Sequence, residues 1–426
     1  MDYIDRNILP VVIEKIRQEQ IVVLTGARQT GKTTLCERLL PRQSSLSYNY
    51  LSFDDPDERL RFQDAGITIL ESMAAPLTIL DEVQKIPILF EQLKYVADKQ
   101  KRLENNKKNS FILTGSSQLI LLKNIKETLA GRAALLHLYP FSLAEVLKTN
   151  NPSLLTKLWL KPKIGKEDKM YFDMLSAEKS RTVIQIRNEH QKWGGYPPVW
   201  QRTDSADKIK WLKDYKSTYV ERDLSDVGQV ASIDNFVLVQ KLLCARTGQL
   251  LSLSEVSRDL SLAVNTVKRY LTLLTLTFQC HLVSPYYQNI GKRLIKSPKI
   301  YFPDAGLNRV ILGEMSTDSG AAYESWVFSE LIKWKQLQRV EPELFFYRTS
   351  GGLEIDFLLV GDGFILPIEA KASEKVTYAD GRNLELFMAE NKKKASLGLV
   401  VYRGRTLTEI RKNIWAVPDW FLVGGI

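Results

Sequence analysis

The first third of the chain alternates short, largely apolar runs with stretches whose apolar residues recur at helical spacing. Such runs are typical of strands that are buried on both faces, as in a parallel sheet. Apolar residues spaced for one helix face, as between Leu89 and Leu103, predict the intervening helices. The runs are Ile21–Leu24, Leu77–Leu80, Ser110–Leu113 and Ala134–Leu138. Together these patterns predict a doubly wound α/β domain over residues 1–145.

Three further regions follow, each with its own pattern. Residues 146–230 begin polar and rich in Lys, pass a rigid break at Trp193–Pro198 and become helical again, so we expect a helical lid and linker. Residues 231–304 predict short helices followed by a β-ribbon, which is a small helical domain. Residues 305–426 mix a helix with several strands and predict an α/β C-terminal domain.

Composition narrows the class of protein. The 426 residues are 44% hydrophobic and 25% charged, which excludes a disordered or collagen-like chain. The three cysteines lie far apart without a C-x-x-C pair, which argues against a disulfide framework or a structural zinc site. The three histidines are not clustered, which argues against a His-rich metal site or a Ser-His-Asp triad. The net charge of +10 favours a polyanionic partner, either nucleic acid or nucleotide.

Features of a targeted or membrane-bound protein are missing from the sequence. The first residues already carry charge and contain no long apolar segment, so we expect no signal peptide. No uncharged apolar run is long enough to span a bilayer. We therefore expect a cytoplasmic protein without a membrane partner.

A phosphate-binding loop follows the first predicted strand. Its residues fit G-x-x-x-x-G-K-[ST] and stand between a buried strand and a helix that starts near Thr34. They are Gly26, Ala27, Arg28, Gln29, Thr30, Gly31, Lys32 and Thr33, and we expect Thr34 to contact the nucleotide as well. Glycines let backbone N–H groups curl around phosphates, Lys32 neutralises the β- and γ-phosphates, and the Thr33 hydroxyl is a ligand for Mg²⁺. The loop therefore predicts ATP and Mg²⁺ as cofactors.

Two carboxylates end the second apolar run. Asp81 is placed to hold Mg²⁺ through water, and Glu82 is placed to polarise the attacking water as a general base. A strand that simply ends in solvated acids is the alternative, but the phosphate loop upstream favours the catalytic interpretation. We therefore expect Lys32, Thr33, Asp81 and Glu82 to carry ATP hydrolysis.

Two further positions in this region remain open between a catalytic and an ordinary role. Ser116, or its neighbour Ser117, follows the strand Phe111–Thr114 and either contacts the γ-phosphate or forms a plain turn at the strand end. Arg132 precedes the next strand and either stabilises transition-state charge in a neighbouring subunit or forms a surface salt bridge.

The small helical domain resembles a winged helix-turn-helix. Two short helices, Leu253–Leu260 and Thr266–Leu274, share an apolar core, and a β-ribbon follows them. If the domain binds DNA, the second helix enters the major groove and the basic wing touches phosphates. The DNA-contact candidates are Lys268 and Arg269 on the helix and Lys292 and Arg293 near the ribbon tip. Ala263 departs from the pattern, since an N-capping Ser is common there, and protein contact remains the alternative role.

The C-terminal region carries a possible metal chemistry of its own. Asp356 lies on one strand, and Glu369 and Lys371 alternate on the next, so the last two point to one face. Two carboxylates for Mg²⁺ and a lysine to orient water are what a metal-dependent nuclease needs, and Glu324 could supply a further ligand. The pattern resembles the PD-(D/E)XK nuclease core. Carboxylates that make only structural pairs are the alternative.

Taken together, the motifs resemble a prokaryotic group of AAA+-type ATPases that carry a C-terminal domain of unknown function. The matching segments are Gly26–Thr34, Leu80–Glu82, Thr114–Ser117, Gly131–Arg132, Tyr139–Glu145, Gly194–Pro197 and Tyr219–Leu224. The resemblance implies a P-loop ATPase and places Arg132 where the family has its arginine finger. It also implies assembly into a homo-oligomeric ring, although a switch that works as a monomer or dimer remains open.

Three functions follow from these features and stay open. The first is an ATP-regulated nucleic-acid enzyme whose C-terminal domain is a nuclease. The second is an ATPase that binds or remodels DNA without cleaving it. The third is a nucleotide switch that binds protein partners and has a catalytically silent C-terminal domain.

Overall fold

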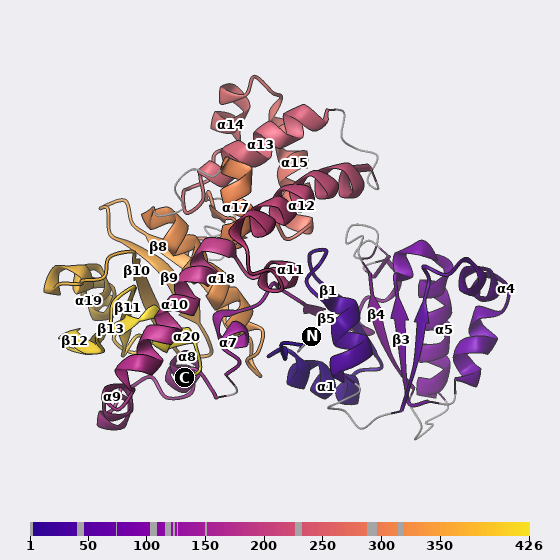
Figure 1. Ribbon diagram of the computed structural model, residues 1–426, viewed down its shortest axis with the longest axis horizontal. Coiled ribbons are helices and arrows are strands. Elements are labelled where there is room, and N and C mark those ends of the chain that lie inside the picture. Colours follow the sequence, from indigo (N-terminus) through magenta and orange to yellow (C-terminus); the bar gives the residue numbers. More distant parts are fainter. Residues whose placement is uncertain are drawn as a thin grey trace. The chain divides into compact units, whose positions relative to one another are not determined.

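The computed structural model describes most of the chain as two compact units (Figure 1). It describes residues 3–40, 47–73, 75–102, 109–115, 121, 124–125, 127–149, 151–225, 232–287, 296–313 and 319–426, with the backbone alone over 219–225. The first unit consists mainly of Met1–Pro140, and the second holds most of the chain from Phe141 to Ile426. Within the described residues, no helix is both long and apolar enough to cross a membrane.

The first unit is built on a five-stranded sheet in the order β2-β3-β4-β1-β5, and every strand pair is parallel. Its strands are β1 (Ile21–Thr25), β2 (Tyr48–Ser52), β3 (Leu77–Asp81), β4 (Ser110–Thr114) and β5 (Ala133–His137). The three central strands β1, β3 and β4 are buried along their whole length, as their apolar runs predict. The parallel α/β fold is therefore confirmed. The edge strand β2 was not predicted, because its sequence Tyr-Asn-Tyr-Leu-Ser contains no continuous apolar run. Its side chains are partly or fully exposed.

Helices cover the sheet of the first unit. They are α1 (Leu9–Gln18), α2 (Lys32–Thr34), which continues as the π-helical turn η1 (Leu35–Leu39), α4 (Pro56–Ser72), the 3₁₀ turn η2 (Val83–Lys85) and α5 (Ile88–Arg102). Asp55 caps α4, because its side chain accepts a hydrogen bond from the Asp57 N–H. Phe62 of α4, Phe90 of α5 and Phe111 of β4 belong to one buried core, and Figure 1 shows α4 next to α5.

The second unit opens with a series of helices. They are α7 (Leu143–Val146), α8 (Leu154–Leu160), α9 (Lys166–Asp173), α10 (Ala177–Trp193), α11 (Pro197–Trp200) and α12 (Ser205–Ser225). Ser142 and Glu145 form a capping box at the start of α7. The short helix α11 begins with two prolines, whose fixed φ suits the first turn of a helix.

Three helices and a two-stranded ribbon follow. They are α13 (Ile233–Ala245), α14 (Leu253–Asp259), α15 (Val264–Leu276), β6 (His281–Val283) and β7 (Lys299–Tyr301). The ribbon is antiparallel, with Leu282 opposite Ile300. The apolar residues predicted to hold α14 against α15 include Val256, Val267 and Leu274, and all three are buried. These elements match the predicted order, whereas the assignment to a winged helix stays a prediction.

The C-terminal part is a six-stranded mixed sheet in the order β12-β13-β11-β10-β9-β8. Its elements are α17 (Ala305–Leu312), α18 (Gly320–Lys335), β8 (Glu343–Arg348), β9 (Glu354–Val360), β10 (Ile365–Lys371), the 3₁₀ turn η3 (Tyr378–Gly381), α19 (Arg382–Glu390), β11 (Gly398–Tyr402), β12 (Thr408–Arg411), β13 (Ile414–Pro418) and α20 (Asp419–Val423). Strands β8, β9 and β10 pair antiparallel, whereas β10, β11 and β13 pair parallel. The sequence predicted a mixed helix and strand region here, and the structure adds the strands β12 and β13 and the helices α17, α19 and α20 to it.

The backbone that follows β5 is anchored inside the second unit. The Phe141 N–H donates to the Gly195 carbonyl at 2.7 Å. The Phe141 carbonyl accepts from Lys333 Nζ at 3.0 Å and lies 2.8 Å from His190 Nε2. Glu330 accepts the Leu143 N–H at 2.8 Å, so α18 and α10 both hold this segment. The first residues of the second unit are therefore held by buried hydrogen bonds within that unit.

Candidate functional site

The loop between β1 and α2 needs glycine at both glycine positions of its G-x-x-x-x-G-K-[ST] motif. Gly26 has φ 148° and Gly31 has φ 92°, a region that L side chains rarely adopt. A Cβ at Gly26 would also lie 2.2 Å from the Leu138 carbonyl oxygen, which no side chain could tolerate. Gln29 also has a positive φ of 64°. The loop therefore has the tight, strained backbone that a phosphate cradle requires.

The loop lysine lies over its own loop. Lys32 is buried, and its Nζ donates to the Gly26 carbonyl at 2.9 Å and the Ala27 carbonyl at 3.0 Å. The Thr30 hydroxyl donates to the same Ala27 carbonyl at 2.9 Å. These carbonyl contacts hold the ammonium group inside the loop curve, at the start of helix α2, where phosphate oxygens could replace the carbonyl acceptors.

An arginine that the sequence analysis missed donates hydrogen bonds to the backbone of the loop. Arg6 is buried, and it donates to the Thr30 carbonyl at 2.7 Å and to the Tyr139 carbonyl at 2.5 Å. The guanidinium therefore ties the phosphate loop to the segment after β5. No local signal marks this role, because the three residues are far apart in the sequence.

Asp81 lies at the carboxyl end of β3, and its carboxylate accepts hydrogen bonds from several hydroxyl groups. Its Oδ2 accepts from the Thr33 hydroxyl at 3.1 Å and from the Tyr50 hydroxyl at 2.9 Å. Its Oδ1 accepts from the Thr114 hydroxyl and from the Glu82 N–H. Burial raises the pKa of the Tyr50 hydroxyl well above its usual range, and the charge of Asp81 adds to this effect. Tyr50 therefore stays a protonated hydrogen-bond donor to the carboxylate.

The pair of Thr33 and Asp81 fits a magnesium ion. A hydroxyl and a carboxylate oxygen are the hard donors that Mg²⁺ prefers, and at phosphate sites the ion needs only one or two protein ligands. In the part of the chain that the structure describes, no group of three or more His, Cys, Asp or Glu is arranged to hold a metal. A Mg²⁺ ion at Asp81 would therefore depend on the phosphates for its other ligands.

Glu82 follows Asp81 with an unusual backbone. Its φ is 55°, a left-handed conformation that is uncommon for a residue other than glycine. Gln84 donates a hydrogen bond from its amide to the Glu82 carboxylate. A Cβ at Gly115 would lie 2.2 Å from the Gln84 side-chain oxygen, so Gln84 stands between Glu82 and the end of β4. Ser116, the other residue predicted here, lies outside the described residues.

Arg132 forms the intramolecular salt bridge that was the alternative to a finger. Its Nε and Nη2 donate to the two carboxylate oxygens of Asp98 at 2.8 and 3.1 Å. The guanidinium lowers the pKa of the Asp98 carboxyl. Arg132 precedes Ala133, which pairs with Ile21 at the start of β1, whereas the phosphate loop follows the end of β1. Arg132 therefore lies near the amino ends of the strands, whereas its own chain's phosphate loop lies at their carboxyl ends.

The four residues of the predicted nuclease motif lie close together, but with a lysine among them. Lys299 of β7 is buried, and its Nζ lies 3.1 Å from Glu324 Oε1 and 2.8 Å from Glu354 Oε1. Asp356 Oδ1 is 3.9 Å from the same Nζ. Asp356 also accepts the Ala370 N–H at 2.8 Å, and Glu324 accepts from the Tyr301 hydroxyl at 2.6 Å. We call Lys299, Glu324, Glu354, Asp356, Glu369 and Lys371 the carboxylate cluster.

The remaining members of the carboxylate cluster are paired as well. Glu369 Oε2 lies 3.5 Å from Lys371 Nζ. Burial raises the pKa of the Glu369 carboxyl well above its usual range, and the neighbouring charge of Asp356 raises it further. Burial likewise raises the pKa of Glu324 to about 7. Lys299 and Lys371 lie beside these carboxylates, although the buried Oε1 of Glu369 has no hydrogen-bond partner. Because ammonium groups already supply positive charge here, the arrangement favours the structural pairs over the predicted metal site of Asp356 and Glu369.

The predicted DNA-contact residues are only partly described. Lys268 on α15 is exposed, as expected. Arg269 is half-buried rather than facing out, with its guanidinium carbon 5.6 Å from the centre of the Tyr270 ring. Lys292 and Arg293 lie outside the described residues. The structure therefore offers Lys268 as the one candidate of the four, within its described part, that lies fully on the surface.

Comparison with protein families divides the chain into three segments. Residues 18–147 match a family described as "AAA domain". Residues 185–318 and 319–422 match two families described as domains of unknown function (DUF8612 and DUF4143). The AAA match covers the parallel sheet and the phosphate loop, and it supports a nucleotide-binding ATPase of the P-loop class in this region.

Relatives and solved structures were also found. An uncharacterized protein of Mycobacterium tuberculosis is 28% identical over 420 residues, covering 96% of this chain and 82% of the relative. One of Methanocaldococcus jannaschii is 24% identical over 355 residues, covering 82% and 74%. The ORC2 protein of Aeropyrum pernix in its ADP form aligns over 71% of this chain and 90% of its own at 12% identity, with a TM-score of 0.29. The replication initiator DnaA bound to AMPPCP and single-stranded DNA aligns over 64% and 90% at 16% identity, with a TM-score of 0.27. Scores this low carry no argument about function.

Proposed function

We propose that the first unit binds ATP with Mg²⁺ and hydrolyses it. The observation that carries this proposal is the 3.1 Å contact between the hydroxyl of Thr33 and the carboxylate of Asp81, next to a strained glycine loop. The loop brings backbone N–H groups and Lys32 to a phosphate chain, and the Thr33–Asp81 pair holds the ion that accompanies it. Mg²⁺, when bound, would neutralise charge on the transferred phosphoryl group.

The chain's own residues would divide the remaining work. Lys32 would exchange its loop carbonyl acceptors for phosphate oxygens, and Arg6 would keep the loop backbone in place. The hydroxyls of Tyr50 and Thr114 would orient Asp81. Glu82 would accept a proton from the attacking water as the general base, and Gln84 would position its carboxylate. Ser116 remains proposed as a contact to the γ-phosphate.

Arg132 acts, in this proposal, only across a subunit interface. It precedes the start of β5, away from its own chain's phosphate loop, which supports the proposal that a neighbouring subunit receives it. The arginine would leave Asp98 to do so, which an exposed salt bridge permits at low cost. Mixing Arg132→Ala chains with Lys32→Ala chains should then restore part of the ATP turnover that each variant lacks. Mixed oligomers of the two variants that restore no turnover would count against the transfer.

We further propose that nucleotide state is coupled to DNA. The net charge of +10, exposed Lys268 on α15, and three helices followed by a ribbon support DNA contact by residues 231–304. A second candidate is a switch that binds protein partners. The lysine inside the carboxylate cluster favours a catalytically silent C-terminal domain, which both candidates share and which a nuclease would not have.

The deciding measurement is ATP turnover by the full chain, with and without single-stranded or double-stranded DNA, at one moderate salt concentration. We expect magnesium-dependent turnover in the parent, none in Lys32→Ala, and unchanged turnover in Lys94→Ala, a matched loss of a half-exposed lysine on α5. Stimulation by DNA would support the DNA-coupled function. Turnover that DNA leaves unchanged would favour the protein-directed switch, and no turnover in the parent would refute the ATPase.

A further inference from the structure

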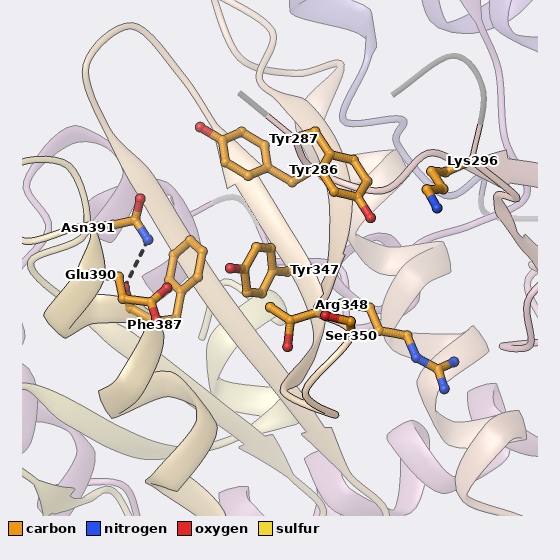
Figure 2. A pocket seen from close by; sticks show the side chains of 10 residues that line it. Tyr286, Tyr287, Lys296, Tyr347, Arg348, Ser350, Phe387, Glu390 and Asn391 are labelled. Carbon is orange, nitrogen blue, oxygen red and sulfur yellow. Dashed lines mark hydrogen bonds between the residues drawn. The ribbon is translucent and has the colours of Figure 1, made fainter. Parts of the chain in front are cut away.

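A pocket lined by aromatic rings lies in the C-terminal part, and none of its lining residues belongs to the sites described above. Its volume is about 670 Å³. Figure 2 shows its wall of rings, to which the segment after β6 contributes Tyr286 and Tyr287, strand β8 contributes Tyr347, and helix α19 contributes Phe387. This size is typical of sites for small molecules and cofactors.

The fold holds these rings in place through the backbone. The Tyr286 N–H donates to the Phe346 carbonyl at 2.7 Å, and the Phe346 N–H donates to the Ser284 carbonyl at 3.2 Å. The segment before the pocket thus pairs with the free side of edge strand β8. The Tyr347 and Phe387 rings pack edge to face at 4.9 Å, and Phe387 is fully buried in the core under α19. The walls are therefore preformed.

The two ends of the pocket differ in charge. Glu390 and Asn391, at the end of α19, lie at one side, and Arg348 and Lys296 lie at the other (Figure 2). Burial raises the pKa of the Tyr347 hydroxyl, and the neighbouring charge of Glu390 adds to this effect. Arg348 is half-exposed, with its Nε 3.7 Å from Glu354, so the guanidinium stays accessible from solvent.

We propose that this pocket binds a nucleotide unit. Aromatic side chains stack on nucleobases, and a carboxylate such as Glu390 accepts hydrogen bonds from a base amino group. Arg348 and Lys296 would contact the phosphate, which a planar guanidinium fits in a bidentate manner. A ligand with a flat ring at one end and an anion at the other matches both ends of the cavity. Such a unit comes either as a free nucleotide or as part of a single strand.

The proposal adds a site to the DNA coupling proposed above, but it does not require ATP hydrolysis. The test therefore uses the full chain with Lys32→Ala, in which the phosphate loop is impaired. The probe is a short fluorescent oligodeoxycytidine, whose anisotropy reports binding at one moderate salt concentration. Free cytidine monophosphate is the competitor that distinguishes the two sources. This readout stays informative even if the parent chain has no ATP turnover.

Variants of two lining residues carry the test. Tyr347→Leu should weaken binding about tenfold through lost stacking, while Tyr347→Phe, which keeps the ring, should stay within about twofold. Arg348→Ala should weaken binding about tenfold and reduce its salt dependence, because a phosphate contact is lost. The matched controls Tyr378→Leu and Arg405→Ala remove an exposed tyrosine and an exposed arginine elsewhere in the same domain and should leave binding unchanged.

Each outcome decides the matter. Competition by free cytidine monophosphate at concentrations matching the strand's nucleotides would assign a free nucleotide, and binding of the strand alone would assign single-stranded nucleic acid. Probe binding that Tyr347→Leu and Arg348→Ala leave intact would overturn the proposal, as would the absence of binding by both probes. Photocrosslinking with an iodinated cytosine should map to the peptides that contain Tyr286 or Tyr347. A crosslink confined to other peptides would also overturn it.

Discussion

Two regions of the molecule bring a lysine and carboxylates together, and they do so in opposite ways. At the phosphate loop, Lys32 contacts backbone carbonyls, while hydroxyls of Thr33, Tyr50 and Thr114 surround Asp81. In the carboxylate cluster, the ammonium of Lys299 itself lies among Glu324, Glu354 and Asp356. The same residue types therefore predict different chemistry in the two places.

The difference lies in which group supplies the positive charge. Neutral hydroxyls hold Asp81 in place without neutralising it, so a divalent ion still has a charge to bind. A buried ammonium already compensates the carboxylates around Lys299, and a metal ion would have to displace it. Residue identity alone does not distinguish a cation site from an internal ion pair. The distinction depends on whether the groups that contact the carboxylates are neutral hydroxyls or a charged ammonium group.

The largest expected effect removes the proposed general base at the phosphate-loop site. Glu82→Gln should lower ATP turnover about 10²–10⁴-fold and leave ATP binding intact, because a general base contributes that factor and the amide keeps the shape. Single-turnover hydrolysis and nucleotide binding measured on the same protein check it. Glu91→Gln, an exposed glutamate on α5, is the matched control. Turnover close to that of the parent would show that another group activates the water.

The next effect removes the ammonium group from the carboxylate cluster, so that its carboxylates could bind a metal ion, as we propose for Asp81. Lys299→Met should destabilise the fold by about 3–5 kcal/mol, because it leaves buried carboxylates without their counter-ion. It should also create a response to Mn²⁺ that raises Tm, which the parent lacks. Urea denaturation and thermal melts with and without Mn²⁺ measure both, with exposed Lys392→Met as control. A parent chain that Mn²⁺ stabilises equally would mean that the cluster binds metal despite Lys299.

A pH profile sharpens the comparison further. The pKa of Glu369 is raised in the folded chain, so the folded state binds a proton that the unfolded state releases above the ordinary carboxyl pKa of 4.5. Stability from this group is complete below that pKa and is lost as pH rises toward the raised value, at up to about 1.4 kcal/mol per pH unit. Glu369→Gln should flatten this fall in chemical denaturation curves, and exposed Glu374→Gln should not. An unchanged slope in Glu369→Gln would place the retained proton elsewhere.

The smallest expected effect concerns the hydroxyls around Asp81. Tyr50→Phe should lower ATP turnover about tenfold and raise the Mg²⁺ concentration for half-maximal turnover, because one hydrogen bond to a charged group is lost. Magnesium titrations of the steady-state rate measure this. Tyr48→Phe, on the same strand but more exposed, is the control. Equal magnesium dependence in Tyr50→Phe and the parent would separate Tyr50 from the ion site.

The sequence predicted the parts of the molecule that are contiguous. The parallel α/β core follows from apolar runs, and the phosphate loop follows from strand, glycine turn and helix in direct succession. In both cases the structural requirement lies within about ten residues, so spacing expresses it. The edge strands β2 and β12 escaped prediction because their partly polar sequences contain no continuous apolar run. The internal strand β13 does contain one, Ile414–Pro418, which the sequence analysis did not single out.

Other features arise only when distant segments meet. Arg6 reaches the loop from the start of the chain, Arg132 is paired with Asp98, and Lys299 comes from the ribbon to fill the carboxylate cluster. Each contact joins residues separated by more than twenty positions, and no local spacing encodes it. The amino-acid pattern therefore decided the chemistry that is available, namely a phosphate cradle and two sets of carboxylates. Tertiary packing decided which carboxylates face hydroxyls and which face a buried ammonium, because burial and counter-charge are properties of the assembled fold.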